Sequence, residues 1–211
     1  MNLQPQEIPI TTFILGTKVV RFDLPMTMID NINKAYDKRK KDMPNFNSEL
    51  AGKIAEEKLV VDLLTDEMKD VFLGCFKKYL EIIDRPNWYC YPASPWINEM
   101  KASEYNPIHF HSSNKTDLGL SSVLMLKRPS TYGKEVTRPD APCNGYLEFV
   151  GGNQEPLSVS QFRVDAQVGE FYVFPYTLLH GVYPFSDTDE VRRTLSYNCN
   201  LYKFDFLANE K

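Results

Sequence analysis

Residues 169–184 have the sequence Gly-Glu-Phe-Tyr-Val-Phe-Pro-Tyr-Thr-Leu-Leu-His-Gly-Val-Tyr-Pro, and this stretch decides the fold class. An aromatic and apolar run ends at Pro175, and a second short run follows His180. Short runs of β-branched and aromatic residues that are bounded by Gly and Pro are typical of strands joined by turns. The segment therefore predicts two strands, Glu170–Phe174 and Gly181–Tyr183, with a histidine just before the second.

The same pattern extends in both directions from this stretch. Turn signals such as Asn144-Gly145 and Gly151-Gly152 separate further apolar runs. We expect additional strands at Trp96–Lys101, Pro107–His111, Leu118–Lys127, Tyr146–Val150, Gln161–Val164 and Arg193–Phe204. About eight short strands with Gly- and Pro-rich turns predict a mainly β fold, a double-stranded β-helix (jelly roll, cupin-like) over residues 87–211.

Residues 1–86 have a different character, with helical patterns and most of the lysines. The segment Ile8–Phe22 suggests two short strands. Thr27 is a candidate N-cap for a helix that ends in the basic run 38–41. Ser48 is a candidate cap for a second, short helix that runs through Ala55. The strongest pattern begins at the N-cap Thr65 and runs to Ile83 with apolar residues at three-and-four spacing. We expect these helices to pack on one sheet, so that residues 1–211 form a single domain.

Composition excludes several classes of protein. The net charge of −4 gives no electrostatic basis for binding nucleic acid. No apolar stretch approaches the roughly 18 residues of a membrane span, and the N-terminus lacks the pattern of a signal peptide. The four cysteines show no CxxC spacing and are expected to be free thiols. These features predict a cytoplasmic protein with no membrane partner.

The three histidines of the chain suggest a metal site. His109 and His111 stand at i and i+2 of a predicted strand, so that their side chains share a face. We expect the fold to place His180 on the opposite side of the same cavity. Three protein ligands that leave open positions suit a mononuclear iron centre, for which imidazole is a common ligand. Asp117 is an alternative to His111 as the third ligand, and ordinary core or surface histidines are the alternative to any metal site.

Arg192 and Thr194 lie beyond His180 on the last predicted strand and share a face. A guanidinium beside a hydroxyl can bind both oxygens of a carboxylate. The alternative is a surface ion pair of Arg192 with the acidic run 187–190. Arg193 faces the other way and is expected at the surface.

From about Trp96 to Asn198 these residues resemble the 2-oxoglutarate- and Fe(II)-dependent oxygenases, and more narrowly the oxygenases of marine bacteriophage genomes that are related to prolyl 4-hydroxylases. The resemblance is carried by Asn106-x-x-His109-x-His111, Leu120–Leu126, Gly145–Phe149, Gly169–Pro175, His180 with Val182–Pro184, and Arg192-Arg193-Thr194 with Tyr197-Asn198. In this family the usual first motif is His-x-Asp or His-x-Glu, whereas this chain has His111 at the position of the acid.

The resemblance implies Fe(II) held by His109 and His180, with His111 or Asp117 as third ligand or with two side chains alone. It implies 2-oxoglutarate as cosubstrate, gripped at its far carboxylate by Arg192 with help from Thr194. The implied reaction is the hydroxylation of a substrate C–H bond with oxygen, which releases succinate and carbon dioxide. For a phage-encoded protein the implied compartment is the cytoplasm of the host cell.

The resemblance to prolyl hydroxylases suggests a peptide or protein substrate hydroxylated at a proline. The long polar loop Pro129–Asn144 is typical of a lid or binding loop. Two other classes stay open on the sequence alone. One is a cupin-type metalloenzyme that does not use 2-oxoglutarate, and the other is a non-catalytic jelly-roll binding module.

Overall fold

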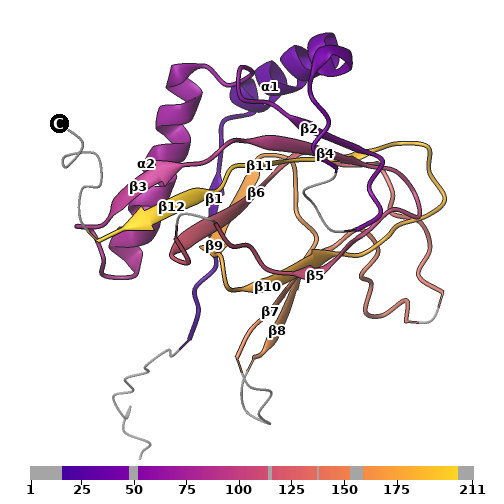
Figure 1. The fold of residues 1–211 in the computed structure, drawn as a ribbon. Coiled ribbons are helices and arrows are strands. Elements are labelled where there is room, and N and C mark those ends of the chain that lie inside the picture. Colours follow the sequence, from indigo (N-terminus) through magenta and orange to yellow (C-terminus); the bar gives the residue numbers. More distant parts are fainter. Residues whose placement is uncertain (1–15, 48–51, 114–115, 137, 153–158, 204–211) are drawn as a thin grey trace, which may run out of the picture.

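The computed structural model describes residues 16–47, 52–113, 116–136, 138–152 and 159–203, and it consists of two antiparallel sheets and two main helices (Figure 1). The major sheet follows the order β1-β9-β6-β11-β4-β2, and β12 joins it beside β6 and carries β3. The minor sheet follows the order β5-β10-β7-β8. The strands of the major sheet are β1 (Val20–Asp23), β2 (Glu56–Leu59), β3 (Tyr89–Pro92), β4 (Trp96–Met100), β6 (Gly119–Lys127), β9 (Glu170–Pro175), β11 (Arg192–Ser196) and β12 (Cys199–Tyr202). Those of the minor sheet are β5 (Asn106–His109), β7 (Leu147–Val150), β8 (Gln161–Val164) and β10 (Leu179–Val182).

The central strands β4, β6, β9 and β11 of the major sheet are buried on both faces. Helices α1 (Met26–Arg39) and α2 (Asp66–Ile82) cover its outer face, and the minor sheet lies across its inner face (Figure 1). On β9, Phe171 and Val173 belong to the core beneath the helices, whereas Tyr172 and Phe174 belong to the core between the sheets. Successive side chains of β9 therefore point into two different cores, which explains why the run 171–174 contains only aromatic and apolar residues. The double-stranded β-helix with helices on one sheet is confirmed.

The predicted helix after Thr65 is confirmed in detail. Its N-cap hydroxyl accepts a hydrogen bond from the Met68 N–H at 3.3 Å. Asp66 and Glu67 stand in the first turn, where negative charge opposes the helix dipole. The buried stripe includes Phe72, Phe76 and Tyr79, whereas the apolar Val71 beside Phe72 is 40% exposed.

The first helix also forms, but it begins at Met26 after Pro25 rather than at an N-cap Thr27. The expected short helix through Ala55 is wrong over its described part, because residues 52–55 are not helical and Lys53 forms an antiparallel β-bridge with Tyr105. Ser48 and Leu50 lie outside the described residues, as does the first half of Ile8–Phe22, whose end forms β1. The expected strand Arg193–Phe204 is two strands, β11 and β12, which pair with different neighbours.

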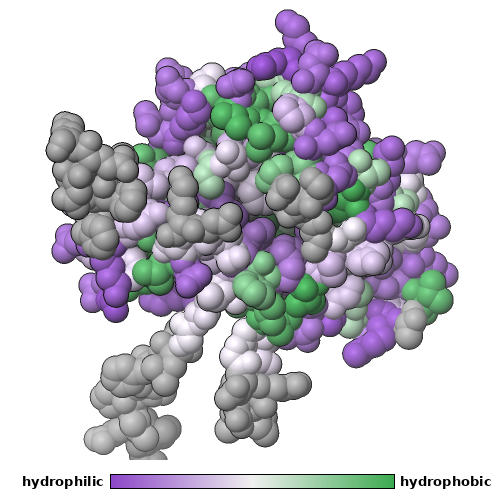
Figure 2. Space-filling view, viewed as in Figure 1, coloured by the Kyte–Doolittle hydropathy of each residue, from purple (hydrophilic) through white to green (hydrophobic). Residues whose placement is uncertain are grey.

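The surface agrees with a protein whose apolar residues are mostly inside. Hydrophilic side chains dominate the side on which α1 lies (Figure 2). Within the described ranges, neither helix combines the length and apolar character that crossing a bilayer requires. The four cysteines are all free thiols.

Candidate metal and cosubstrate site

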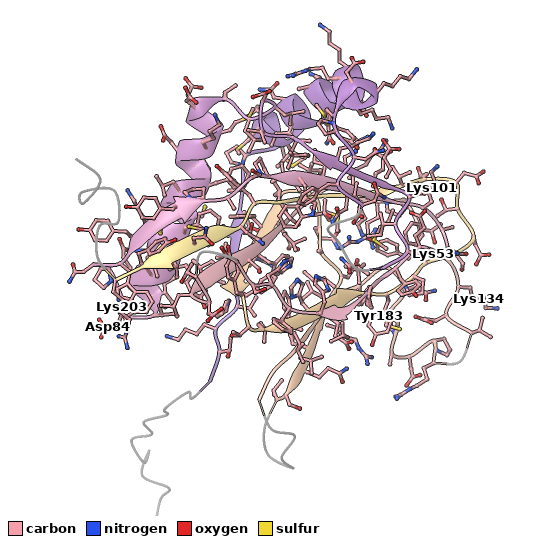
Figure 3. All side chains as sticks on the ribbon, viewed as in Figure 1. Lys53, Asp84, Lys101, Lys134, Tyr183 and Lys203 are labelled. Carbon is pink, nitrogen blue, oxygen red and sulfur yellow. The ribbon has the colours of Figure 1, made fainter. Side chains whose placement is uncertain are left out.

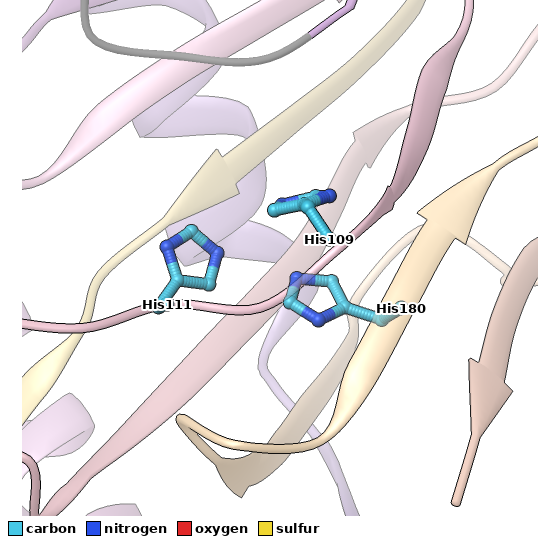
Figure 4. A group of neighbouring side chains, drawn as sticks. All are labelled: His109, His111 and His180. Carbon is cyan, nitrogen blue, oxygen red and sulfur yellow. The ribbon is translucent and has the colours of Figure 1, made fainter.

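The three histidines come together in the space between the two sheets (Figure 4). One ring nitrogen from each of His109, His111 and His180 lies within 4.8 Å of the others. The ring centroids are 4.4 Å apart for His109 and His180, 5.0 Å for His109 and His111, and 5.1 Å for His111 and His180. Among the described residues, this is the only group of three or more His, Cys, Asp or Glu side chains that could together hold a metal ion.

The sheet register explains how residues so far apart in sequence meet. Strands β5 and β10 are antiparallel neighbours, and His109 is directly opposite His180. The expectation that they would lie on opposite sides of the cavity was therefore wrong, because both belong to the minor sheet and cross-strand partners share a face. His111 lies two residues beyond His109, past the end of β5, and its N–H donates to the Tyr176 carbonyl at 3.0 Å.

Hydrogen bonds orient two of the rings. The Nδ1 atom of His109 lies 2.7 Å from the Pro107 carbonyl, and that of His180 lies 2.9 Å from the Leu178 carbonyl. Because a carbonyl oxygen can only accept, each Nδ1 donates a proton and each Nε2 keeps a free lone pair. This is the tautomer in which Nε2 can bind a metal ion.

The surroundings of the site keep two imidazoles uncharged. Burial, together with the nearby His109 and His111, lowers the pKa of His180 to about 3. Burial and His109 likewise lower the pKa of His111 to about 4. Neutral imidazole is the form that binds metal, so that this donor set fits a divalent cation.

Strand β11 brings Arg192 and Thr194 to the wall of the same cavity, as their shared face predicts. Arg192 is 1% exposed, its Nε donates to the Gly145 carbonyl at 3.1 Å, and its Nη1 lies 3.9 Å from the Met100 sulfur. Its Nη2 is buried without a partner. Burial lowers the pKa of this guanidinium, which nevertheless stays protonated. The alternative of a surface ion pair is therefore wrong.

The expectation that Arg193 lies at the surface was also wrong. It is 2% exposed and contacts Glu99, Asp37 and the Asn33 side chain beneath α1. Because the helices cover the outer face of the major sheet, a residue that faces away from the cavity is as buried as one that faces it.

Tyr132 lies near Arg192, whereas Asp117, the alternative third ligand, lies outside the histidine group. Tyr132, from the long loop, is 7% exposed, and its buried hydroxyl makes no hydrogen bond, although it lies close enough to Arg192 to affect that pKa. No pattern in the sequence marks Tyr132 as part of the site, because no periodicity places a side chain that comes from a loop. Asp117 is exposed and does not belong to the histidine group.

Two facing antiparallel sheets with three converging imidazoles define a jelly-roll protein with a candidate metal site. A family described as "Putative 2OG-Fe(II) oxygenase" matches residues 94–198, which run from just before β4 to just before β12 and include all three histidines. The chain belongs to the 2-oxoglutarate- and Fe(II)-dependent oxygenases, and its cofactors are Fe(II) and the cosubstrate 2-oxoglutarate. No curated protein sequence matches the chain.

Solved structures with the same fold include three prolyl hydroxylases. A Pseudomonas putida prolyl-4-hydroxylase is 13% identical with a TM-score of 0.57, over 86% of this chain and 91% of that one. A Trichoplax adhaerens prolyl hydroxylase in complex with a hypoxia-inducible factor peptide is 12% identical with a TM-score of 0.56, over 88% and 83%. The viral collagen prolyl hydroxylase of Paramecium bursaria Chlorella virus-1, in complex with 2-oxoglutarate, is 13% identical with a TM-score of 0.53, over 87% and 94%.

Proposed function

We propose that His109, His111 and His180 hold the Fe(II) of an oxygenase that hydroxylates a C–H bond. The hydrogen bonds that orient the rings of His109 and His180 support this assignment, as does the burial that keeps His111 and His180 uncharged. A third imidazole, that of His111, takes the place of the acid that is usual in the family. Because imidazole is neutral, this centre carries one more unit of positive charge than one with a carboxylate ligand. That charge favours the binding of an anionic cosubstrate beside the metal.

The observation that carries the cosubstrate assignment is the buried, unpartnered Nη2 of Arg192. A buried charge without a counter-ion is costly, and its fork can bind both oxygens of a carboxylate. We assign Arg192 to the far carboxylate of 2-oxoglutarate, with the Thr194 and Tyr132 hydroxyls as further donors. The keto-acid end of the same molecule then faces the histidines.

When bound, iron and 2-oxoglutarate activate oxygen for the hydroxylation of substrate, with release of succinate and carbon dioxide. The protein residues orient the reactants and exclude water. Backbone carbonyls fix the orientation of the His109 and His180 rings. Arg192 fixes the position of the far carboxylate and so the direction in which the cosubstrate lies. Phe174, whose ring centroid lies 4.6 Å from that of His180, forms an apolar wall behind that ring.

Anaerobic titration of the Fe(II)-loaded protein with 2-oxoglutarate tests this function. Chelation of the metal by the keto acid gives a charge-transfer absorption band, and admission of oxygen should then yield succinate. His109→Ala and His180→Ala should lose both iron and the band. A cupin-type metalloenzyme that does not use 2-oxoglutarate would bind iron and show no band, and a binding module would hold no iron.

We further propose a peptidyl proline as the hydroxylated group. All three structures described above are prolyl hydroxylases, and one was solved with a peptide bound. Incubation with proline-containing peptides, Fe(II) and 2-oxoglutarate should add the mass of one oxygen atom to a peptide. An unchanged mass for every peptide, together with succinate formation, would show that the substrate is another compound.

A further inference from the structure

Glu57, on the edge strand β2, is a buried carboxyl group that its own fold does not satisfy. It is 3% exposed, and its Oε1 has no hydrogen-bond partner. The other buried carboxyl groups among the described residues, those of Glu99, Glu104 and Glu148, all accept hydrogen bonds. Glu57 is therefore the exception in a structure that otherwise pairs its buried acids.

The sheet register places Glu57 in line with the proposed cosubstrate site. Glu57 is directly opposite Asn98 on β4, and Asn98 is directly opposite Thr194 on β11. Directly opposed residues share a face, and neighbouring strands lie about 4.8 Å apart. A row of polar side chains therefore runs from Thr194, where 2-oxoglutarate is expected, to Glu57 at the edge of the sheet. Thr194 and Asn98 both line the cavity.

Near this edge the backbone joins the segment that precedes β2 to the segment that precedes β5. Lys53 and Tyr105 exchange hydrogen bonds of 3.0 and 3.1 Å, and Ile54 beside them lines the cavity. Figure 3 places Lys53 and Tyr183 at the same end of the molecule, which is where the edge of the major sheet approaches the minor sheet. Glu57 thus lies near this junction, on the face of the major sheet that Asn98 and Thr194 turn toward the cavity.

Three buried acceptor oxygens in this region have no donor. They are Oε1 of Glu57 and the Oδ1 atoms of Asn98 and Asn106. Burial and the neighbouring Glu104 raise the pKa of Glu57 to about 7, and no cation offsets them. The unpartnered donors of the cavity, Trp96 Nε1 and Arg192 Nη2, stand in adjacent rows of the sheet. The row of Thr194, Asn98 and Glu57 therefore lacks a cationic group that could donate several hydrogen bonds to these acceptor oxygens.

We propose that Glu57, with Asn98 and Asn106, forms a substrate subsite for a cationic nitrogen group, an ammonium or a guanidinium. The inference rests on the proposed function and defines the class of substrate. An anionic substrate group is excluded from this subsite by Glu57 and Glu104. A cation fits beside the dianionic cosubstrate and returns the Glu57 carboxyl group to its charged form.

The test compares matched probes that differ only in the charge of their arginine side chains. L-arginine and acetyl-Arg-Pro-Arg-amide are each paired with the compound in which citrulline replaces arginine, and succinate formation above the substrate-free level is measured with the Fe(II)-loaded protein. The cationic probe should stimulate succinate formation at least about tenfold more than its neutral partner, which is about 1.4 kcal/mol of binding. In Glu57→Gln the ratio should fall to within about twofold of one.

Glu56→Gln is the matched control. Glu56 is the neighbouring residue of β2, but it faces the helix side, where Lys40 contacts it at 3.2 Å. This variant should keep the preference for the cationic probe. Equal stimulation by both probes, no stimulation by either, or a preference that survives Glu57→Gln would overturn the subsite. The charge-transfer band with 2-oxoglutarate separates these results from a failure of the proposed function, in which the band itself is absent.

Discussion

Replacement of Arg192 by Met should separate cosubstrate binding from fold stability. The wild-type side chain holds a buried charge whose Nη2 has no partner and whose Nη1 contacts only a thioether sulfur. Truncation of one partner of a buried, hydrogen-bonded charge pair costs about 2–5 kcal/mol of binding. Since 1.4 kcal/mol is a factor of ten, the Kd of 2-oxoglutarate should rise roughly 30-fold to several thousand-fold.

The same change should leave the protein without 2-oxoglutarate as stable as before, or more stable, because it removes an uncompensated buried charge. Chemical denaturation of the Fe(II)-loaded protein without oxygen measures both effects. At 100 times the wild-type Kd, 2-oxoglutarate should stabilise wild type by about 2.7 kcal/mol and Arg192→Met by less than about 1 kcal/mol.

Arg193→Met is the internal control, because it alters the adjacent arginine on the opposite face of β11. Glu99 would lose its buried partner, and the free energy of unfolding should fall by about 3–5 kcal/mol. The Kd of 2-oxoglutarate should stay near the wild-type value in whatever fraction folds. Arg192 does not bind the cosubstrate if Arg192→Met binds 2-oxoglutarate as tightly as wild type, or if Arg193→Met weakens binding and Arg192→Met does not.

Three further changes test other parts of the structure. Gly181→Ala should lower iron content measured by mass spectrometry, because the added Cβ would lie 2.9 Å from the Asn106 carbonyl and push β5, with His109, away from β10; wild-type iron content would contradict this. Tyr132→Phe should raise the Kd of 2-oxoglutarate about 2- to 10-fold by removing one hydroxyl donor, and an unchanged titration would exclude that role. Glu57→Gln should stabilise the protein by up to about 3 kcal/mol at pH 8 and hardly at all below pH 4.5. The reason is that a carboxyl pKa raised from 4.5 to about 7 makes wild type lose stability as the pH rises between these values; denaturation curves at the two pH values decide the matter.

The sequence was sufficient to predict the parts of the fold that have strong local signals. Glycine and proline turns marked most of the strands, and the Thr65 cap with its apolar stripe marked α2. The period of two on β11 correctly placed Arg192 and Thr194 on one face. These predictions succeed because each depends on neighbours within a few residues along the chain.

What could not be predicted depends on which elements pack together. Nothing local shows that His109 is directly opposite His180, since that pairing is set by sheet topology. The burial of Arg193 depends on α1, and the approach of Tyr132 to Arg192 depends on the path of a loop. Strand β2 has the sequence Glu-Glu-Lys-Leu, which carries no apolar alternation. Glu56 on one face pairs with Lys40, and Glu57 on the other face is directly opposite the polar Asn98.

The most direct test of the proposed iron site is an anomalous difference map at the iron absorption edge, from crystals grown without oxygen in Fe(II) and 2-oxoglutarate. We expect one peak within coordination distance of Nε2 of His109, Nε2 of His180 and the His111 ring, with a carboxylate of 2-oxoglutarate on Arg192. A map without a peak between these three rings, or with its peak at other residues, would contradict it.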